Sequence, residues 1–376
     1  MKIAMICYPT HGGSGVVASE LGLALAKKGH EVHFVSYAVP FRLRAFHPNV
    51  FIHEVDVAAY PLMKYPPYAL GLTNKLVEIT VEYGIDILHA HYAVPHAVSA
   101  YLAKQILNNP KIKVITTLHG TDITLLGADK SFYRVIKYSI ERSDGVTAVS
   151  DYLRDRTKKD FEIARDIRRI YNFIDVHKAD NLEEGPCRRE LYAPRDHKVL
   201  MHASNFRPIK RVSDVVRIFA QVRAAMPSKL LLIGEGPERL FIQQLARDLG
   251  LRDDVVFLGE VDYIEQLLNC ADLFLLTSEH ESFGLVALEA MICGVPVVGS
   301  ITGGLPEVVI HGETGYLFPI GETNKMAEAA IALLRDENKR QQFAQNGRER
   351  ARLFDLKRVL PEWEAYYQEV LTAESP

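Results

Sequence analysis

Two glutamates and the helix start between them are the part of this sequence best suited to chemistry. Glu281 and Glu289 are separated by seven residues in the segment SEHESFGLVALEAMICG, which follows the apolar run LFLLTS. A regular helix starting near Phe283 and Gly284 would place the two carboxylates about 12 Å apart along its axis, at ~1.5 Å per residue. Carboxylates that hydrolyse a glycoside flank one bond at roughly 5 to 9.5 Å. The wider spacing suits an extended ligand instead.

A nucleotide sugar laid along this helix would use both carboxylates. Its sugar would lie near Glu281 and its ribose hydroxyls near Glu289. Its diphosphate would lie over the free N–H groups of Gly284 and Leu285 at the helix start. The alternative is that Glu281 only favours the positive end of the helix dipole. That alternative leaves Glu289 among apolar neighbours, where a carboxylate needs a partner.

Basic residues follow a second apolar run, VLMHAS, in the loop that starts at Asn205. Arg207, Lys210 and Arg211 are three cations within five positions. At an effective dielectric near 20, one cation about 4 Å from a phosphate oxygen interacts by roughly 4 kcal/mol before desolvation. A solvated surface loop is the alternative. The chain has no D-x-D triplet and no His/Cys cluster with zinc spacing, so we expect neither a metal ion nor a cofactor.

A glycine-rich loop follows the first apolar run of the chain. Gly13, Ser14 and Gly15 precede a helical pattern, where backbone N–H groups can approach an anion. With Ala18 they also match the dinucleotide pattern G-x-G-x-x-A, which makes an NAD-dependent oxidoreductase a rival. That pattern needs an acidic residue about twenty positions on, and the sequence there, HFVSYAV, has none. A tight turn without a ligand is the remaining alternative.

The elements that position these residues form two doubly wound α/β units. Apolar runs of strand length alternate with helical patterns, which predicts parallel sheets covered on both faces. The boundary near Tyr171 gives a Rossmann-like domain over residues 1–170 and a second over 171–354. Residues 355–376 end the chain with an amphipathic helix that packs back on the first domain. Because ligands of such sheets bind beyond the carboxyl ends of the strands, two facing sheets predict one central cleft. The predicted strands are KIAMICY, EVHFVS, FIHEVDV, ILHAH, VITTLH and GVTAVS, then VLMHAS, LLLIG, VVFLG, LFLLTS and VPVVGS.

Length and charge narrow the function classes. A chain of 376 residues exceeds the size at which one hydrophobic core stops growing, so two domains are expected. A net charge of -3 lacks the basic field of a general nucleic-acid binder. The start MKIAMICYP is too short for a signal or membrane segment, which favours a cytoplasmic protein without stable membrane association.

These motifs resemble glycosyltransferase family four, whose fold is called GT-B. The glutamates of ESFGLVALE match the E-x7-E motif of the family, Lys210 its diphosphate-binding lysine and GGSG its first glycine loop. Asn205 stands where many members carry the first basic residue of a pair, and Arg207 is the candidate substitute. The resemblance implies a metal-independent transferase with catalytic His119, Lys210 and Glu281, and His119 would line the sugar site.

The resemblance also implies which residues bind the two substrates. The first domain would hold the acceptor through Ser14, Tyr92, Thr117 and Arg142. Most donor contacts would come from the second domain. The implied donor-binding residues are Gly13, Ser14, Gly15, Asn205, Arg207, Lys210, Glu281, Phe283, Gly284, Leu285, Val286 and Glu289.

Longer strings narrow the resemblance within the family. VPFRL, KYPPYALGL, HAHYAVPHAV, TTLHGTDITLLG, YNFID and SNFRPIKRV are similar to members that transfer N-acetylglucosamine from UDP-N-acetylglucosamine to L-malate, the first step of bacillithiol biosynthesis. This implies retention of anomeric configuration, with the departing phosphate oxygen deprotonating the malate hydroxyl. Alternatives are another UDP- or GDP-sugar transferase with a different small acceptor, a UDP-sugar epimerase, or a non-catalytic sugar-nucleotide sensor. Oligomeric state is open, and a homo-oligomer is compatible with the sequence.

Overall fold

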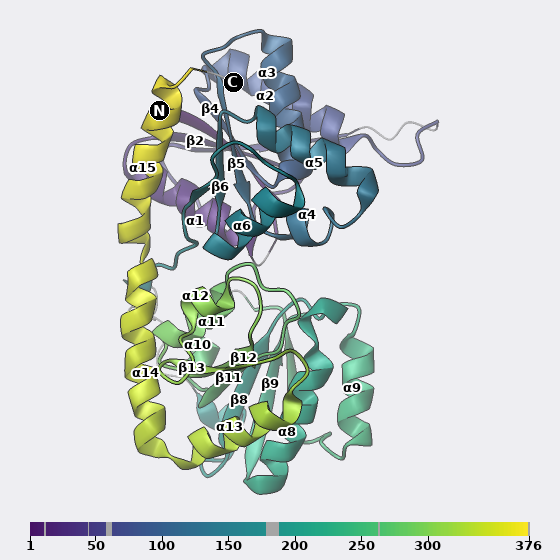
Figure 1. Ribbon diagram of the computed structural model, residues 1–376, viewed down its shortest axis with the longest axis vertical. Helices are drawn as coiled ribbons and strands as arrows, with labels where there is room; N and C mark the ends of the chain where they lie inside the picture. Colours follow the sequence, from purple (N-terminus) through teal and green to yellow (C-terminus); the bar gives the residue numbers. More distant parts are fainter. Residues whose placement is uncertain (11–12, 44, 58–61, 178–187, 262–263, 375–376) are drawn as a thin grey trace. The chain divides into compact units, whose positions relative to one another are not determined.

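The computed structural model of the chain describes all residues except 11–12, 44, 58–61, 178–187, 262–263 and 375–376. It divides into two compact units. The first unit comprises Met1–Asn172 and Leu356–Pro376, and the second comprises Phe173–Asp355. Each unit contains a parallel sheet with helices on both faces (Figure 1).

The first unit is built on a seven-stranded sheet in the order β3-β2-β1-β4-β5-β6-β7. Its strands are β1 (Lys2–Ile6), β2 (Glu31–Ser36), β3 (Val50–Glu54), β4 (Ile87–His91), β5 (Lys113–Leu118), β6 (Gly145–Ala148) and β7 (Arg168–Arg169). Its helices are α1 (Ser14–Lys27), α2 (Tyr68–Tyr83), α3 (Val98–Leu107), α4 (Thr121–Thr124), α5 (Lys130–Arg142), α6 (Asp151–Asp160) and α15 (Leu356–Thr372), with short turns η1 (Phe41–Leu43) and η2 (Ala93–Ala97).

The last helix, α15, packs against the first unit although it ends the chain. Its buried side chains recur at helical spacing at Val359, Trp363, Tyr366 and Val370. The Tyr366 hydroxyl donates to the Val146 carbonyl oxygen at 3.2 Å. The predicted return of the C-terminal helix to the first domain is therefore confirmed.

The second unit is built on a six-stranded sheet in the order β10-β9-β8-β11-β12-β13. Its strands are β8 (Lys198–Ala203), β9 (Ser228–Ile233), β10 (Val255–Gly259), β11 (Leu273–Leu276), β12 (Val297–Ser300) and β13 (Gly315–Phe318). Its helices are α8 (Val212–Ala225), α9 (Arg239–Asp248), α10 (Glu265–Leu268), α11 (Leu285–Ile292), α12 (Leu305–Val308), α13 (Thr323–Arg335) and α14 (Glu337–Ala351), with turns η3 (Arg189–Leu191), η4 (Pro208–Lys210) and η5 (Arg352–Phe354).

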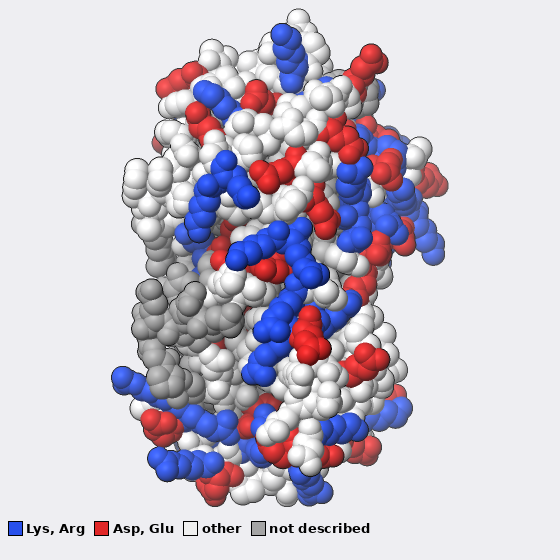
Figure 2. All heavy atoms as spheres, turned by 90° about the vertical axis from the view of Figure 1, so that its left-hand side faces the viewer, with Lys and Arg blue, Asp and Glu red and all other residues white. Residues whose placement is uncertain are grey.

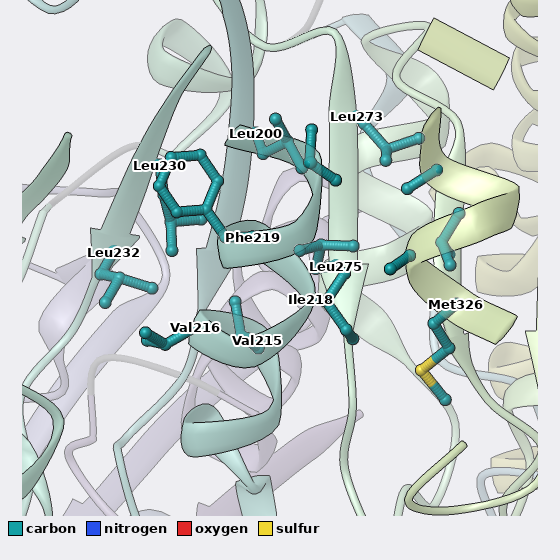
Figure 3. Packing of buried hydrophobic residues seen from close by; sticks show 14 of the residues in the cluster. Leu200, Val215, Val216, Ile218, Phe219, Leu230, Leu232, Leu273, Leu275 and Met326 are labelled. Atoms are coloured by element: carbon teal, nitrogen blue, oxygen red, sulfur yellow. The ribbon is translucent and has the colours of Figure 1, made fainter. Parts of the chain in front are cut away.

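The core of the second unit fixes α8 on one face of its sheet (Figure 3). Val215, Ile218 and Phe219 follow the helical spacing that turns one face of α8 inward. They pack with leucines of three strands and with Met326 of α13. This packing holds the loop between β8 and α8, which carries the predicted basic residues.

Both sheets change winding direction between two central strands. The order reverses between β1 and β4 in the first unit and between β8 and β11 in the second. Ligands of open parallel sheets bind in the crevice beyond the carboxyl ends of such strands. The loops after β1, β4, β8 and β11 are therefore the places to look for chemistry, and the α/β fold with two parallel sheets is as predicted.

The distribution of surface charge and the character of the helices bear on whether the chain has a charged interface or a membrane span. Lys and Arg side chains lie among Asp and Glu side chains on the face shown in Figure 2, in keeping with the net charge of -3. Among the described helices, none combines the length and the apolar character that a membrane crossing requires.

Candidate functional site

In the second unit, Lys210 and Glu281 meet although 71 positions separate them. Lys210 Nζ donates to Glu281 Oε2 at 2.9 Å. The two side chains are 22% and 15% exposed, so the pair is largely withdrawn from water without being sealed off. Lys210 ends η4 beyond β8, and Glu281 lies in the loop beyond β11. The neighbouring central strands thus deliver the predicted cation and carboxylate to one place.

Backbone contacts hold these two loops together. The Glu279 N–H donates to the Ile209 carbonyl oxygen at 2.8 Å. The Thr277 hydroxyl donates to the Arg211 carbonyl oxygen at 3.0 Å. The contact between Lys210 and Glu281 therefore rests on a fixed backbone frame as well as on charge.

A third loop clamps the backbone around Glu281. The Gly304 N–H donates to the Glu281 carbonyl oxygen at 2.8 Å, and the Thr302 hydroxyl donates to the Glu279 carbonyl oxygen at 2.6 Å. Gly303 has a φ of 56°, and a Cβ there would overlap the Glu281 carbonyl. Sequence reasoning missed this clamp. Its signal was the pair of glycines just after the run VPVVGS.

Helix α11 starts later than the glutamate spacing predicts. Gly284 precedes it with a φ of 98°, and the helix runs from Leu285 to Ile292. Glu281 is thus outside the helix, and the axial separation of about 12 Å expected for a regular helix between the glutamates was wrong. Glu289 lies four residues after Leu285, about 6 Å along the axis.

The first turn of α11 contains the N–H group of Leu285, which was predicted to face the diphosphate, and that of Val286. The helix-internal bonds to the Gly284 carbonyl oxygen come from Ala287 and Leu288, so the N–H groups of Leu285 and Val286 precede the regular ladder. The Phe283 side chain, in contrast, is 2% exposed and packs edge-on against Phe354 at 5.5 Å. The Phe283 ring therefore belongs to the core, and the donor contact expected of this residue stays a prediction.

Glu289 is partly buried on α11 near a buried thiol. Burial, with Glu265 and Glu289 nearby, raises the pKa of Cys293 to about 12. Glu289 also has an interaction partner within the chain. Its contact with a ribose stays a prediction.

The loop after β8 carries two exposed polar side chains. Asn205 and Arg207 are exposed on either side of Phe206, which is fully buried with a φ of 32°. Gly234 and Gly236 lie so close to the backbone of Ser204 and Asn205 that a Cβ would overlap it. The second glycine loop is therefore a support for the first basic loop.

In the first unit, the glycine loop ends against Tyr92, the residue directly after β4. Gly13 has a φ of 60° and precedes α1, which begins at Ser14. A Cβ on Gly15 would lie 2.7 Å from the Tyr8 carbonyl oxygen, so the turn admits only glycine there. The Ser14 hydroxyl donates to the Tyr92 hydroxyl at 2.8 Å, which joins two predicted acceptor-binding residues.

Four buried histidines lie beneath this contact at the carboxyl ends of β4 and β5. His91 Nδ1 and His119 Nε2 are 2.9 Å apart, and their rings stack at 5.1 Å. The Tyr92 ring lies 5.3 Å from the His119 ring. Burial lowers the pKa of His119 to about 3 and that of His89 to about 3, so both are neutral near pH 7. In the described part of the chain, no group of His, Cys, Asp or Glu side chains is placed to hold a metal ion.

A buried carboxylate ties the two histidine-bearing loops together. Asp122 is fully buried and accepts from the N–H groups of Ala93 and Gly120 at 3.0 Å each. Burial outweighs these bonds and raises the pKa of Asp122 to about 6. Sequence reasoning missed this residue, although the string HGTD directly after an apolar run marked it.

Comparisons with known proteins agree with this arrangement. Residues 11–178 match the family described as Glycosyltransferase Family 4, and residues 187–350 match the one described as Glycosyl transferases group 1. The N-acetyl-alpha-D-glucosaminyl L-malate synthase of Bacillus anthracis is 47% identical over 99% of this chain and 97% of its own length. The chain belongs to glycosyltransferase family 4.

Other members and solved structures extend the likeness. An uncharacterized glycosyltransferase of Methanocaldococcus jannaschii is 30% identical over 85% of both chains. Sucrose-phosphate synthase of Thermosynechococcus elongatus matches with a TM-score of 0.81 and 25% identity over 98% of this chain and 99% of its own. Anabaena HepE in complex with UDP-glucose has the same fold, with a TM-score of 0.81 at 24% identity over 98% of this chain and 100% of its own.

Two acceptor residues predicted for this family 4 enzyme are placed differently from the prediction. Thr117 is 2% exposed, and its hydroxyl is 2.7 Å from His89 Nε2 and 2.8 Å from the Thr147 hydroxyl. Its side chain therefore supports His89 and is not available to an acceptor. Its carbonyl oxygen accepts from the Tyr92 N–H at 3.0 Å, so Thr117 positions Tyr92 through the backbone.

Arg142 lies near the opposite edge of the sheet. The Asp144 N–H donates to the carbonyl oxygen of Val114 at 2.7 Å, near the start of β5, whereas Tyr92 bonds to Thr117 near its end. At about 3.3 Å per residue these two points are ~10 Å apart along the strand. Arg142 is exposed, with its guanidinium 5.5 Å from the Tyr138 ring centre. The structure does not bring Arg142 together with Ser14 and Tyr92, because α5 runs back toward the amino edge.

Proposed function

We propose that this chain transfers N-acetylglucosamine from UDP-N-acetylglucosamine to the hydroxyl of L-malate with retention of configuration. The observation that carries the donor site is the contact of Lys210 with Glu281 directly before α11. The substrate pair rests on the relative of 47% identity, which is named for N-acetylglucosaminyl L-malate synthesis.

The second unit would bind the donor around the start of α11. The N–H groups of Leu285 and Val286, at the positive end of the helix dipole, would face the diphosphate. The Lys210 cation would exchange part of its contact with Glu281 for a phosphate oxygen, at roughly 4 kcal/mol before desolvation. Glu281 would then accept hydrogen bonds from sugar hydroxyls, and Glu289 from the ribose.

The first unit would bind the acceptor near Ser14 and Tyr92. Malate carries two carboxylates, so its site needs a cation. Helix α5 packs on η2 directly after Tyr92, and its Tyr138 hydroxyl donates to Tyr101 of α3 at 3.0 Å. Arg134 lies one helical turn before Tyr138 and so nearer the carboxyl edge of the sheet. It is exposed, on the same stripe of α5 as Arg142. We therefore assign Arg134 to the acceptor carboxylate in place of Arg142.

Retention requires no protein nucleophile in this scheme. The bond between the anomeric carbon and the β-phosphate oxygen breaks, and the malate oxygen bonds to the same face of that carbon. The malate hydroxyl proton passes to the departing phosphate oxygen, so the products are UDP and the glycoside. Lys210 and the first turn of α11 would stabilise the charge that develops on the phosphate.

A panel of UDP- and GDP-sugars with hydroxy acids tests the proposal directly. Mass spectrometry should show N-acetylhexosaminyl malate with UDP-N-acetylglucosamine and L-malate, and NMR of the product should show an α-linkage. A β-linked product would overturn retention. A changed sugar released without an acceptor would identify an epimerase, and transfer to another hydroxy acid alone would overturn the acceptor assignment.

A further inference from the structure

The contact between His91 and His119 allows only two arrangements of its proton. Both imidazoles are neutral, since burial lowers the pKa of His119 to about 3 and that of His91 well below its ordinary value. A neutral imidazole has one N–H and one bare nitrogen. At 2.9 Å, either His91 Nδ1 donates to His119 Nε2, or His119 Nε2 donates to His91 Nδ1.

The other nitrogen of His91 decides between them. His91 Nε2 is buried and has no hydrogen-bond partner among the residues that the structure describes. If His119 donated, His91 would carry its proton on Nε2 as a buried N–H without an acceptor. Buried N–H donors without an acceptor are rarer in proteins than buried acceptors without a donor, because burial then costs the full desolvation free energy of the N–H group. The arrangement with the His91 proton on Nδ1 leaves only a bare lone pair at Nε2.

His96 in the same cluster follows this rule. Its Nδ1 lies 2.5 Å from the His91 carbonyl oxygen, which can only accept, so that nitrogen carries the proton. His96 Nε2 is then bare, and it too is buried without a partner in the described part of the chain. The cluster therefore tolerates bare nitrogens in the positions where His91 Nε2 and His96 Nε2 lie.

We propose that His91 is a positioning residue that fixes His119 with its proton on Nδ1. His119 then offers an N–H to an oxygen of the ligand, and it cannot accept a proton at that nitrogen. The ligand oxygen would be a sugar hydroxyl, which rests on the proposed function above. The consequence for the reaction is that His119 does not serve as the base, which agrees with the proposed transfer of the acceptor proton to the departing phosphate oxygen.

The tautomer can be read in the unmodified protein. In 15N-histidine-labelled protein at pH 7.5, long-range 1H–15N correlation should show His119 with a protonated Nδ1 and a bare Nε2, and His91 the same. The His119 signals are identified by their loss in His119→Gln. A protonated Nε2 on His119 would overturn the inference whatever the activity. The expected tautomer in a chain that transfers no sugar would instead refute the proposed function and leave this inference standing.

Variants test the positioning role in turnover. His91→Asn keeps an amide N–H near the Nδ1 position, whereas His91→Leu removes it. We expect kcat to fall about tenfold in His91→Leu, as for loss of one hydrogen bond, with largely restored kcat in His91→Asn. His96→Leu removes an equally buried ring and its hydrogen bond to the His91 carbonyl, but leaves the side-chain contact between His91 and His119 in place, and so controls for packing. Equal losses in all three variants at equal thermal stability would contradict the role.

Discussion

The charge of Lys210 is compensated by Glu281 at 2.9 Å and is therefore held in place before any phosphate is bound. A preorganised cation of this kind stabilises a leaving group without reorganisation during the reaction. For this role the geometry of the loop matters more than the number of basic residues it carries. Lys210 pairs with Glu281, whereas Arg211 next to it pairs with Asp214.

Lys210→Met should lower kcat by about 10², because it removes the charge but keeps most of the side-chain length. Steady-state kinetics with the donor saturating measures the effect. Arg211→Met is the matched control, since it removes the adjacent cation that pairs with Asp214. Turnover that is equal in the two variants would exclude Lys210 from leaving-group stabilisation.

Gly303→Ala should displace the Glu281 backbone and weaken donor binding at least tenfold. The new Cβ would overlap the Glu281 carbonyl, in addition to the cost of a φ of 56° for a side-chain-bearing residue. Gly312→Ala is the control, because its φ of 80° is equally unfavourable but its Cβ would meet open space. Calorimetric titration with UDP-N-acetylglucosamine in the absence of acceptor should separate them, and equal affinities would show that the clamp is unnecessary.

At the scale of elements, the apolar runs predicted most strands, but not their edges or their partners. β13 went unpredicted because only three apolar residues separate its first residue, Gly315, from Pro319, so no longer apolar run marks it. Nothing local in the sequence marks Lys210 and Glu281 as neighbours, because the order of β8 and β11 in the sheet decides their contact. The motifs predicted which residues could take part in chemistry, whereas the order of the strands in the sheet determines which of these residues are in contact.

Arg142 shows how residue type and helix direction can point to different places. Its residue type suits an anionic acceptor, but the direction of α5 carries it toward the amino edge of β5. A helix that connects two parallel strands runs back against them, so tracing the chain from β5 to β6 predicts this position of Arg142.

The direction of α5 makes a paired test possible. Arg134 and Arg142 lie eight residues apart on one stripe of the helix, about 12 Å along its axis. Arg134→Ala should raise the KM for malate at least tenfold and leave the KM for the donor unchanged, whereas Arg142→Ala should change neither. A larger effect at Arg142 would contradict the assignment of the acceptor to the carboxyl edge.

At the scale of the whole molecule, the two units differ in their buried histidines. Burial lowers the pKa of His89 to about 3, of His96 to about 4 and of His119 to about 3 in the first unit, and His91 shifts in the same direction. In the second unit, burial lowers the pKa of His202 to about 4. Each unit has its own sheet, so this difference should appear as different responses to acid.

Acidification should therefore unfold the first unit before the second. A histidine whose folded pKa lies below its unfolded value binds protons mainly when unfolded, so its contribution is intact above pH 6.5 and lost as pH falls toward the folded pKa. From pH 7.5 to 5.5 this costs about 1.4 kcal/mol for each such histidine. Asp122, with its pKa raised to about 6, gains protons when folded and offsets only about 1 kcal/mol.

Urea denaturation at the two pH values measures this loss in the first unit. The single tryptophan, Trp363, is buried in α15, so its fluorescence follows the first unit alone. Hydrogen exchange of strands in both sheets then shows the order of opening. We expect amides of β4 and β5 to lose protection at pH 5.5 before those of β8 and β11. If β8 and β11 opened first, the neutral histidine cluster would not be what limits stability in acid.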